Sequence, residues 1–200
     1  MFISVLMTLC TQLFVLTKQT KQLIKETYIP CAPGQPERVD SEYERNGIAD
    51  VFMIFEPLAG RCETIVTETR TAIDFANVLK FTSDVMYPDA EKIILTTDNL
   101  NTHTFTSLYK AFPAEEAHRL ASRFEWHFTP KHGSWLDMAE IEISIMCRKA
   151  LAKPIADMDS FKKQVESWTS TRNVLPSTVN WQFTAADARI ELKRLYPIIL

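Results

Sequence analysis

The hydrophobic and polar positions along the first half of the chain predict strands followed by a helix. Two apolar, β-branched runs at 48–56 and 61–68 flank a short turn containing Gly60, and they predict a β-hairpin. Apolar residues recur near helical spacing over 71–87, which predicts a helix. The β-branched run at 92–97 predicts a further strand directly after it.

The second half of the chain predicts mainly helices. The expected elements are a helix at 105–123, a strand at 124–129 and helices at about 135–152, 158–173 and 184–197. Pro113 interrupts the first of these helices, and it either starts a second helix or kinks the first. Ser134, Asp159 and Thr184 stand where N-caps are expected, with Asp137 at the capping-box position after Ser134.

The segment before residue 48 has two parts with different patterns. Residues 1–16 are apolar but contain no basic residue and no clear cleavage site, which favours a buried first strand over a secretory signal. The run is also too short and interrupted for a membrane span. Residues 18–48 are polar and contain prolines and the pair Asn46-Gly47, which predicts a long connection with little regular structure.

The order of these elements predicts an α/β fold. Three strands, a helix, a strand, a helix, a strand and further helices form the layout of a ribonuclease H-like domain. That layout has a mixed sheet with antiparallel strands 1–3, helices on both faces and, here, extra C-terminal helices. We expect residues 1–157 to form the core, with 1–20 as a divergent start, and residues 158–200 to extend the same domain.

Composition narrows the class of protein. The 200 residues, 46% hydrophobic and 24% charged, suit one globular domain. A formal charge of −3 provides no broad cationic field, which counts against free-standing DNA binding by the whole surface. The four cysteines form no zinc-binding pairs and are expected to be reduced thiols, as in a cytoplasmic protein.

Asp98 is the first candidate site residue, because it ends the apolar strand predicted at 92–97. Side chains at strand ends are exposed by loops and held by a rigid scaffold. The alternative is structural, since Asp98 and Asn99 could simply form an Asx turn. A second carboxylate elsewhere is needed to decide between these interpretations.

Glu140 is that second candidate, because it falls within an apolar arc of the predicted helix at 135–152, whereas Glu142 and Lys149 fall outside it. The apolar members of the arc are Leu136, Ala139, Ile143, Cys147 and Ala150. An acid on an apolar face is costly unless paired or bound to a cation, although Glu140 could also reach water or pair with Lys131 or Arg148. Together, Asp98 and Glu140 predict a magnesium-dependent phosphoryl-transfer site.

Several sequence motifs, in order, resemble a known family. They are PGQPERVDSEYERNG (33–47), FEPLAG (55–60), DNLNTH (98–103), TPKHGSWLDMAEIE (129–142) and WQFTAADARIELKRLYP (181–197). Residues 21–197 resemble bacterial insertion-sequence transposases of the mariner superfamily, which have a ribonuclease H-like DDE catalytic domain. Joint occurrence of these motifs in order makes the resemblance specific.

The resemblance implies a role for each candidate residue. Asp98 would be the second acid and Glu140 the third acid of a DDE site that binds two Mg²⁺ ions, with Mn²⁺ as a substitute. His103, Lys131 and His132 would contact substrate phosphates or orient the acids, unless they are ordinary loop or capping residues. The implied partners are transposon-end and target DNA, with self-association as a further expectation, in the bacterial cytoplasm and without a membrane.

The chain departs from the family pattern at the first acid. The family segment L-D-E-T-x-K-Q-L corresponds here to residues 16–23, LTKQTKQL, so Thr17 replaces the Asp and Lys18 replaces the next acid. Loss of that Asp, with a Lys ammonium close by, predicts poor metal binding and an inactive copy. Asp50 and Glu56 are the nearest acids that could substitute.

A second departure concerns DNA recognition. The family recognises its element ends through an N-terminal helix-turn-helix region, and the sequence does not show one. We therefore expect an N-terminally truncated copy without specific end recognition. The alternative is a non-catalytic remnant that folds and associates with intact transposase or with DNA.

Overall fold

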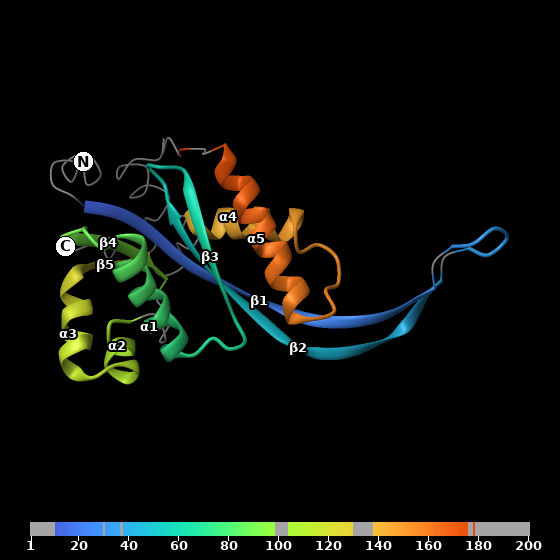
Figure 1. Ribbon diagram of the computed structural model, residues 1–200, viewed down its shortest axis with the longest axis horizontal. Helices are drawn as coiled ribbons and strands as arrows, with labels where there is room; N and C mark the ends of the chain where they lie inside the picture. Colours follow the sequence, from blue (N-terminus) through green and yellow to red (C-terminus); the bar gives the residue numbers. More distant parts are fainter. Residues whose placement is uncertain are drawn as a thin grey trace, which may run out of the picture.

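The structure, a computed structural model, contains one mixed sheet with helices on both faces (Figure 1). It describes residues 11–29, 31–36, 38–98, 104–129, 138–175 and 178, with the backbone alone over 11–17, 26–29 and 38–42. The strands are β1 (Thr11–Ile29), β2 (Arg38–Glu56), β3 (Arg61–Thr67), β4 (Lys92–Thr97) and β5 (Phe124–Phe128). The helical segments are α1 (Ala72–Phe81), η1 (Thr82–Met86), α2 (Thr106–Ala111), α3 (Ala114–Arg123), α4 (Met138–Lys149) and α5 (Met158–Val174).

The sheet confirms the predicted ribonuclease H-like fold class. Its strand order is β3-β2-β1-β4-β5. Strands β1, β2 and β3 are antiparallel, whereas β4 pairs parallel with β1 and β5 pairs parallel with β4. The predicted strand at 92–97 has the bounds of β4, and the predicted hairpin at 48–56 and 61–68 is formed by the second half of β2 with β3.

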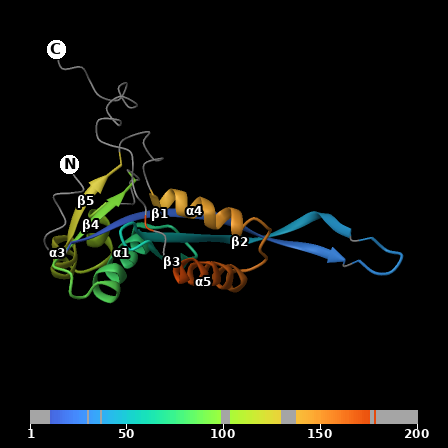
Figure 2. The ribbon, with the colours of Figure 1, turned by 90° about the horizontal axis from the view of Figure 1, so that it is seen from above.

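The prediction of an irregular connection over 18–48 is wrong. Most of that segment belongs to β1 and β2, whose antiparallel register runs from Val15↔Phe55 to Ile29↔Arg38. Figures 1 and 2 show the outer part of this pair as a long ribbon that extends away from the rest of the molecule. Local sequence could not reveal it, because the polar strands of this hairpin are held by backbone hydrogen bonds and carry no apolar alternation.

The Asn46-Gly47 pair forms a bulge inside β2 instead of a turn. The register changes between Gln22↔Ile48 and Ile24↔Arg45, so two residues of β2 oppose one residue of β1. Gly47 has φ of 89°, which side-chain-bearing residues rarely adopt, and its carbonyl accepts a hydrogen bond from Gln22 Nε2 at 2.6 Å. The glycine therefore allows the ribbon to bend without ending the strand.

The predicted helices that fall on described residues are confirmed in position and corrected in detail. The helix expected over 71–87 is α1 followed by the π-helical turn η1, and Thr71 and Asp74 form a capping box at its start. Pro113 starts a new helix, α3, because it occupies the N-cap position. Helix α5 is capped by Asp157, and the predicted cap Asp159 lies within the first turn of that helix instead.

Some sequence predictions fall on segments that the structure does not describe. They are Ser134, Asp137, Thr184 and the helix expected at 184–197. Among the described residues, no helix is long and apolar enough to cross a membrane. The described cysteines, Cys31, Cys62 and Cys147, are free thiols, as expected.

Two apolar cores lie on opposite faces of the sheet, because side chains alternate along β2. Phe52 and Ile54 belong to the core beneath α1, α2 and α3. Val51, Met53 and Phe55 belong to the core beneath α4 and α5. Continuous burial of this β2 segment explains why it lacks polar positions apart from Asp50, which is itself buried.

The cap of α5 gives a test of the fold. Asp157 accepts hydrogen bonds from the Ser160 backbone N–H at 2.8 Å and from the Ser160 hydroxyl at 2.9 Å. Because Asp157→Ala removes both, we expect its melting temperature, measured by circular dichroism, to fall by roughly 2–4 °C. Asp159→Ala is the matched control and should have the smaller effect. The reverse order would contradict this assignment of the cap.

Candidate active site

The register of β1 places position 17 beside Asp98. In the parallel pairing of β1 with β4, the last matched residues are Leu16 and Thr97, so Thr17 and Asp98 are the next residues along the two strands. Asp98 directly follows β4 and is half-buried. On its other side, position 17 is in register with Met53 of β2, which lies in the core beneath α4. Position 17 and Asp98 are the positions where the family resemblance expects the first and second acids, and their backbones lie next to each other at this strand end.

Glu140 lies in the first turn of α4, which packs on this same face of the sheet. It is half-buried, next to the fully buried Ala139. Glu140 therefore lies at the margin of the buried face of α4. Helix α4 contacts β1 and β2 on this face, and β4 is the next strand beside β1.

The predicted apolar arc of α4 is wrong in one respect, because Glu142 lies inside the buried stripe. The buried residues of α4 are Ala139, Glu142, Ile143 and Met146. Glu142 is stabilised there by a bidentate pair with Arg172 of α5, at 2.8 and 3.0 Å. Local periodicity could not indicate this, because the partner that offsets the charge lies 30 residues away.

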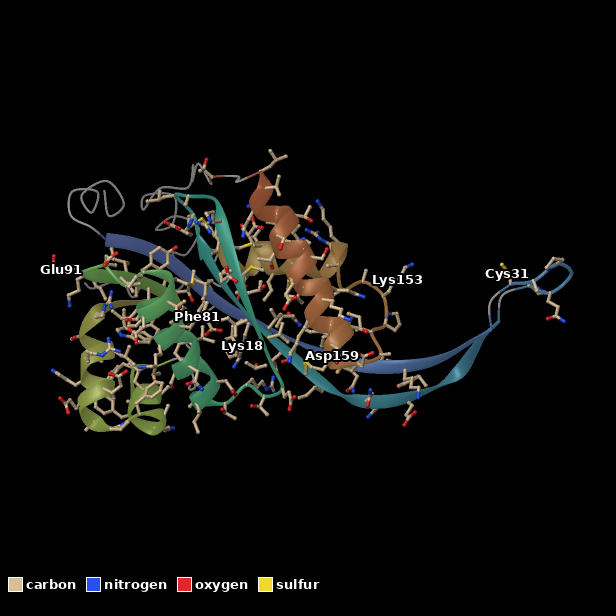
Figure 3. The ribbon with its side chains drawn as sticks, in the orientation of Figure 1. Lys18, Cys31, Phe81, Glu91, Lys153 and Asp159 are labelled. Atoms are coloured by element: carbon tan, nitrogen blue, oxygen red, sulfur yellow. The ribbon has the colours of Figure 1, made fainter. Side chains whose placement is uncertain are left out.

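Lys18 brings a positive charge into the neighbourhood of Asp98. Burial lowers the pKa of the Lys18 ammonium from its ordinary value of 10.5, while the charge of Asp98 acts in the opposite direction. Arg70 lowers the same pKa further, and Asp50 raises it. Figure 3 shows Lys18 in the body of the molecule, far from Cys31 at the tip of the ribbon. The charge of Lys18 therefore interacts with that of Asp98, at a place where a metal ion would need negative charge.

Neither Asp50 nor Glu56 takes the place of an acid at position 17. Asp50 is fully buried in register with Thr20, whose hydroxyl donates to its Oδ1, and its Oδ2 has no hydrogen-bond partner among the described residues. Glu56 accepts a hydrogen bond from the Tyr87 hydroxyl at 2.9 Å. Burial, and then this hydrogen bond, raise the pKa of Tyr87. Asp50 and Glu56 therefore have hydrogen-bond partners elsewhere in the fold, and neither stands in for the acid at position 17.

The donor set does not fit the two-metal site that the motif implies. Within the ranges that the structure covers, no three His, Cys, Asp or Glu residues are grouped so that they could hold a metal ion. Proteins usually hold Mg²⁺ through one or two carboxylates together with waters and substrate phosphates, and position 17 supplies no carboxylate to such a set. The predicted residues His103, Lys131 and His132 lie outside the described residues.

A family comparison defines the class of protein. The model of a family described as DDE superfamily endonuclease matches residues 17–162, which is more than half of the chain. The chain therefore belongs to the DDE superfamily of endonucleases. No curated protein sequence matches it.

Two solved structures of the Mos1 transposase have the same fold. The Mos1 mariner paired-end complex with Mn has a TM-score of 0.52 and 15% identity, over 82% of this chain and 50% of that chain. The Mos1 strand transfer complex has a TM-score of 0.51 and 17% identity, over 80% and 47%. The chain thus spans about half the length of these relatives. At such low identities the likeness to these structures shows the fold alone. The family match is what assigns the chain to the DDE superfamily.

The electrostatic setting of Lys18 predicts a specific pH dependence. Since its pKa is lower in the folded chain than its ordinary 10.5, the unfolded chain keeps its proton to higher pH. As pH rises through the lowered pKa toward 10.5, the free energy of unfolding of the wild type should therefore rise relative to Lys18→Met. Urea unfolding across this range measures the difference. Lys25→Met, which removes an exposed lysine of the same strand, is the control, and an equal trend there would contradict the assignment.

Proposed function

We propose that this chain is the catalytic domain of a bacterial insertion-sequence transposase of the mariner superfamily, in a copy that lacks catalytic activity. The activity of its active relatives would be metal-dependent cleavage and transfer of DNA strands. The observation that carries the proposal is the register of β1 and β4, which puts Thr17 beside Asp98. In the proposed site, Thr17 would stand where the first acid of an active relative lies, and it carries no carboxylate.

The retained residues have defined parts in this proposal. Asp98 and Glu140 are the remaining acids, and both lie at or beside the face that α4 covers. In an active relative the bound metal ions would activate the attacking oxygen and stabilise the leaving oxygen at phosphorus. Here the protein supplies the scaffold and two of the acids, while Lys18 opposes cation binding near Asp98.

The solved structures with the same fold support DNA as the partner in the proposed function. The two Mos1 structures are a paired-end complex and a strand transfer complex, and they share the fold of this chain. The net charge of −3 over the 200 residues predicts that this chain by itself binds DNA weakly, because phosphate contacts depend on cationic surface. Self-association and the proposed contacts of His103, Lys131 and His132 belong to the same proposal.

Restoring the missing acids tests the proposal. We expect the wild-type chain to leave supercoiled plasmid intact with Mg²⁺ or Mn²⁺. The variant Thr17→Asp/Lys18→Glu should nick it at least about tenfold faster, because a complete acid set holds the metal ions that the present donors cannot. Nicked and linear products separated on agarose measure the rates.

Two further variants control this assay. Adding Asp98→Asn to the restored variant should abolish nicking, whereas adding Asp89→Asn, an acid in the loop before β4, should leave it unchanged. Nicking by the wild type that disappears with Asp98→Asn would contradict the proposed inactivity.

The alternative function is a non-catalytic remnant that associates with intact transposase or with DNA. Its support is that the fold remains well packed on both faces of the sheet although the first acid is absent. If neither the wild type nor the restored variant nicks DNA, this alternative is favoured. Co-purification with an intact transposase of the same superfamily, and DNA mobility shifts at low salt, would then test it directly.

A further inference from the structure

A buried ion pair joins α4 and α5 on the face of the sheet that carries the proposed site. Arg172 donates from Nη2 to Glu142 Oε1 at 2.8 Å and from Nε to Glu142 Oε2 at 3.0 Å. Only 10% of the Glu142 side chain and 15% of the Arg172 side chain are exposed. A third donor, Arg172 Nη1, reaches the carbonyl of Gly60 at 3.2 Å. The pair is therefore bidentate, with two parallel N–H···O hydrogen bonds that restrict the orientation of both side chains as well as pairing their charges.

Helix α5 provides a firm anchor for Arg172. Next to it, Asn173 accepts from the Cys62 N–H at 3.0 Å and donates to the Cys62 carbonyl at 2.7 Å. One turn earlier, the hydroxyls of Thr169 and Thr64 lie 2.8 Å apart. These contacts tie α5 to β3 through both backbone and side-chain groups. The position of the Arg172 guanidinium relative to the sheet is consequently well defined.

Glu142 and Glu140 lie on opposite flanks of α4. Each residue of a helix turns by about 100°, so two residues are separated by about 200°. Ala139, Ile143 and Met146 form the middle of the buried stripe against β1 and β2, and Glu142 forms its margin on the side of α5 and β3. Glu140 therefore belongs to the opposite flank, on the side of β1 and β4, where Asp98 ends its strand.

Apolar packing alone defines the rotation of α4 loosely. The apolar part of its buried stripe is Ala139, Ile143 and Met146, which pack in the core that also contains Val51 and Met53, and such apolar contacts are non-directional. A bidentate hydrogen-bonded pair at the margin of the stripe is directional, so a small rotation of the helix breaks it. The pair is thus suited to hold Glu140 at a fixed angle.

We propose that Glu142 and Arg172 are positioning residues for the active site: their ion pair sets the rotation of α4 and so holds Glu140 toward Asp98. This inference rests on the proposed function of those two acids. Arg172 lies beyond residue 162, where the match to the family model ends. Helix α5 would therefore be a required support of the acid-bearing helix in this chain.

Cysteine cross-linking tests the inference without metal or catalysis. In Asp98→Cys/Glu140→Cys, a short bis-methanethiosulfonate reagent should join the two thiols, and mass spectrometry of the 98–140 linked peptide excludes the native cysteines. Adding Arg172→Met should lower the yield by roughly threefold or more, because α4 can then rotate. Arg172→Lys keeps the charge but loses the fork, and it should give an intermediate yield.

Two controls separate positioning from stability. Arg119→Met removes an arginine that pairs with Asp84 and Glu116 on the opposite side of the sheet, and it should leave the yield unchanged. Glu142→Met/Arg172→Met replaces both charges with apolar groups, which should restore the melting temperature but not the yield. If the yield recovers with stability in this double variant, the pair acts only by holding α5 in place and the inference is wrong.

The remaining outcomes distinguish the inference from the proposed function. An unchanged yield in Arg172→Met would overturn the positioning role while leaving the assignment of Asp98 and Glu140 intact. No cross-link in the parent Asp98→Cys/Glu140→Cys variant would show that the two positions do not face each other, and it would overturn both. Nicking by the restored variant is measured independently and would stand if only the positioning role failed.

Discussion

The register of the central strand β1 is the constraint on which the rest of the structure depends. β1 pairs antiparallel with β2 over most of its length and parallel with β4 over its first residues. These two pairings divide the side chains of β2 between two cores and bring the end of β4 next to position 17. A shift of one residue would exchange the two faces of β1 and separate that position from Asp98.

Different helices and different polar contacts cover the two faces of the sheet. Helices α1, α2 and α3 close one face with an apolar core and an outer ion-pair network around Asp84, Glu116 and Arg119. The other face is covered by α4 and α5. A directional hydrogen-bonded ion pair joins α4 to α5, and further directional hydrogen bonds join α5 to β3. Such contacts define orientation more narrowly than apolar packing does. The site of the proposed chemistry lies on this second face.

Much of the fold could be predicted from sequence because local patterns were strong. The strand at 92–97, the hairpin strand at 61–68 and the helix beginning after Thr71 had periodicity and caps that agreed with the tertiary structure. The long β1–β2 ribbon was missed, because polar strands of a hairpin carry no apolar alternation to reveal them. The sequence predicts Asp159 as the cap of α5, whereas Asp157 is the cap, because two neighbouring acids cannot be distinguished until the helix bounds are known.

For the candidate site, the sequence by itself determined which residue types are present: Asp98 after an apolar strand, Glu140 on a helix, and Thr17 with Lys18 where two acids are expected. Only the tertiary structure decided that position 17 adjoins Asp98, that the charge of Lys18 acts on that acid, and that Glu142 is buried against Arg172. The physical reason is the range of the interactions. Periodicity and capping act within a few residues, whereas strand register, electrostatic neighbours and buried ion pairs join residues that are far apart in the chain.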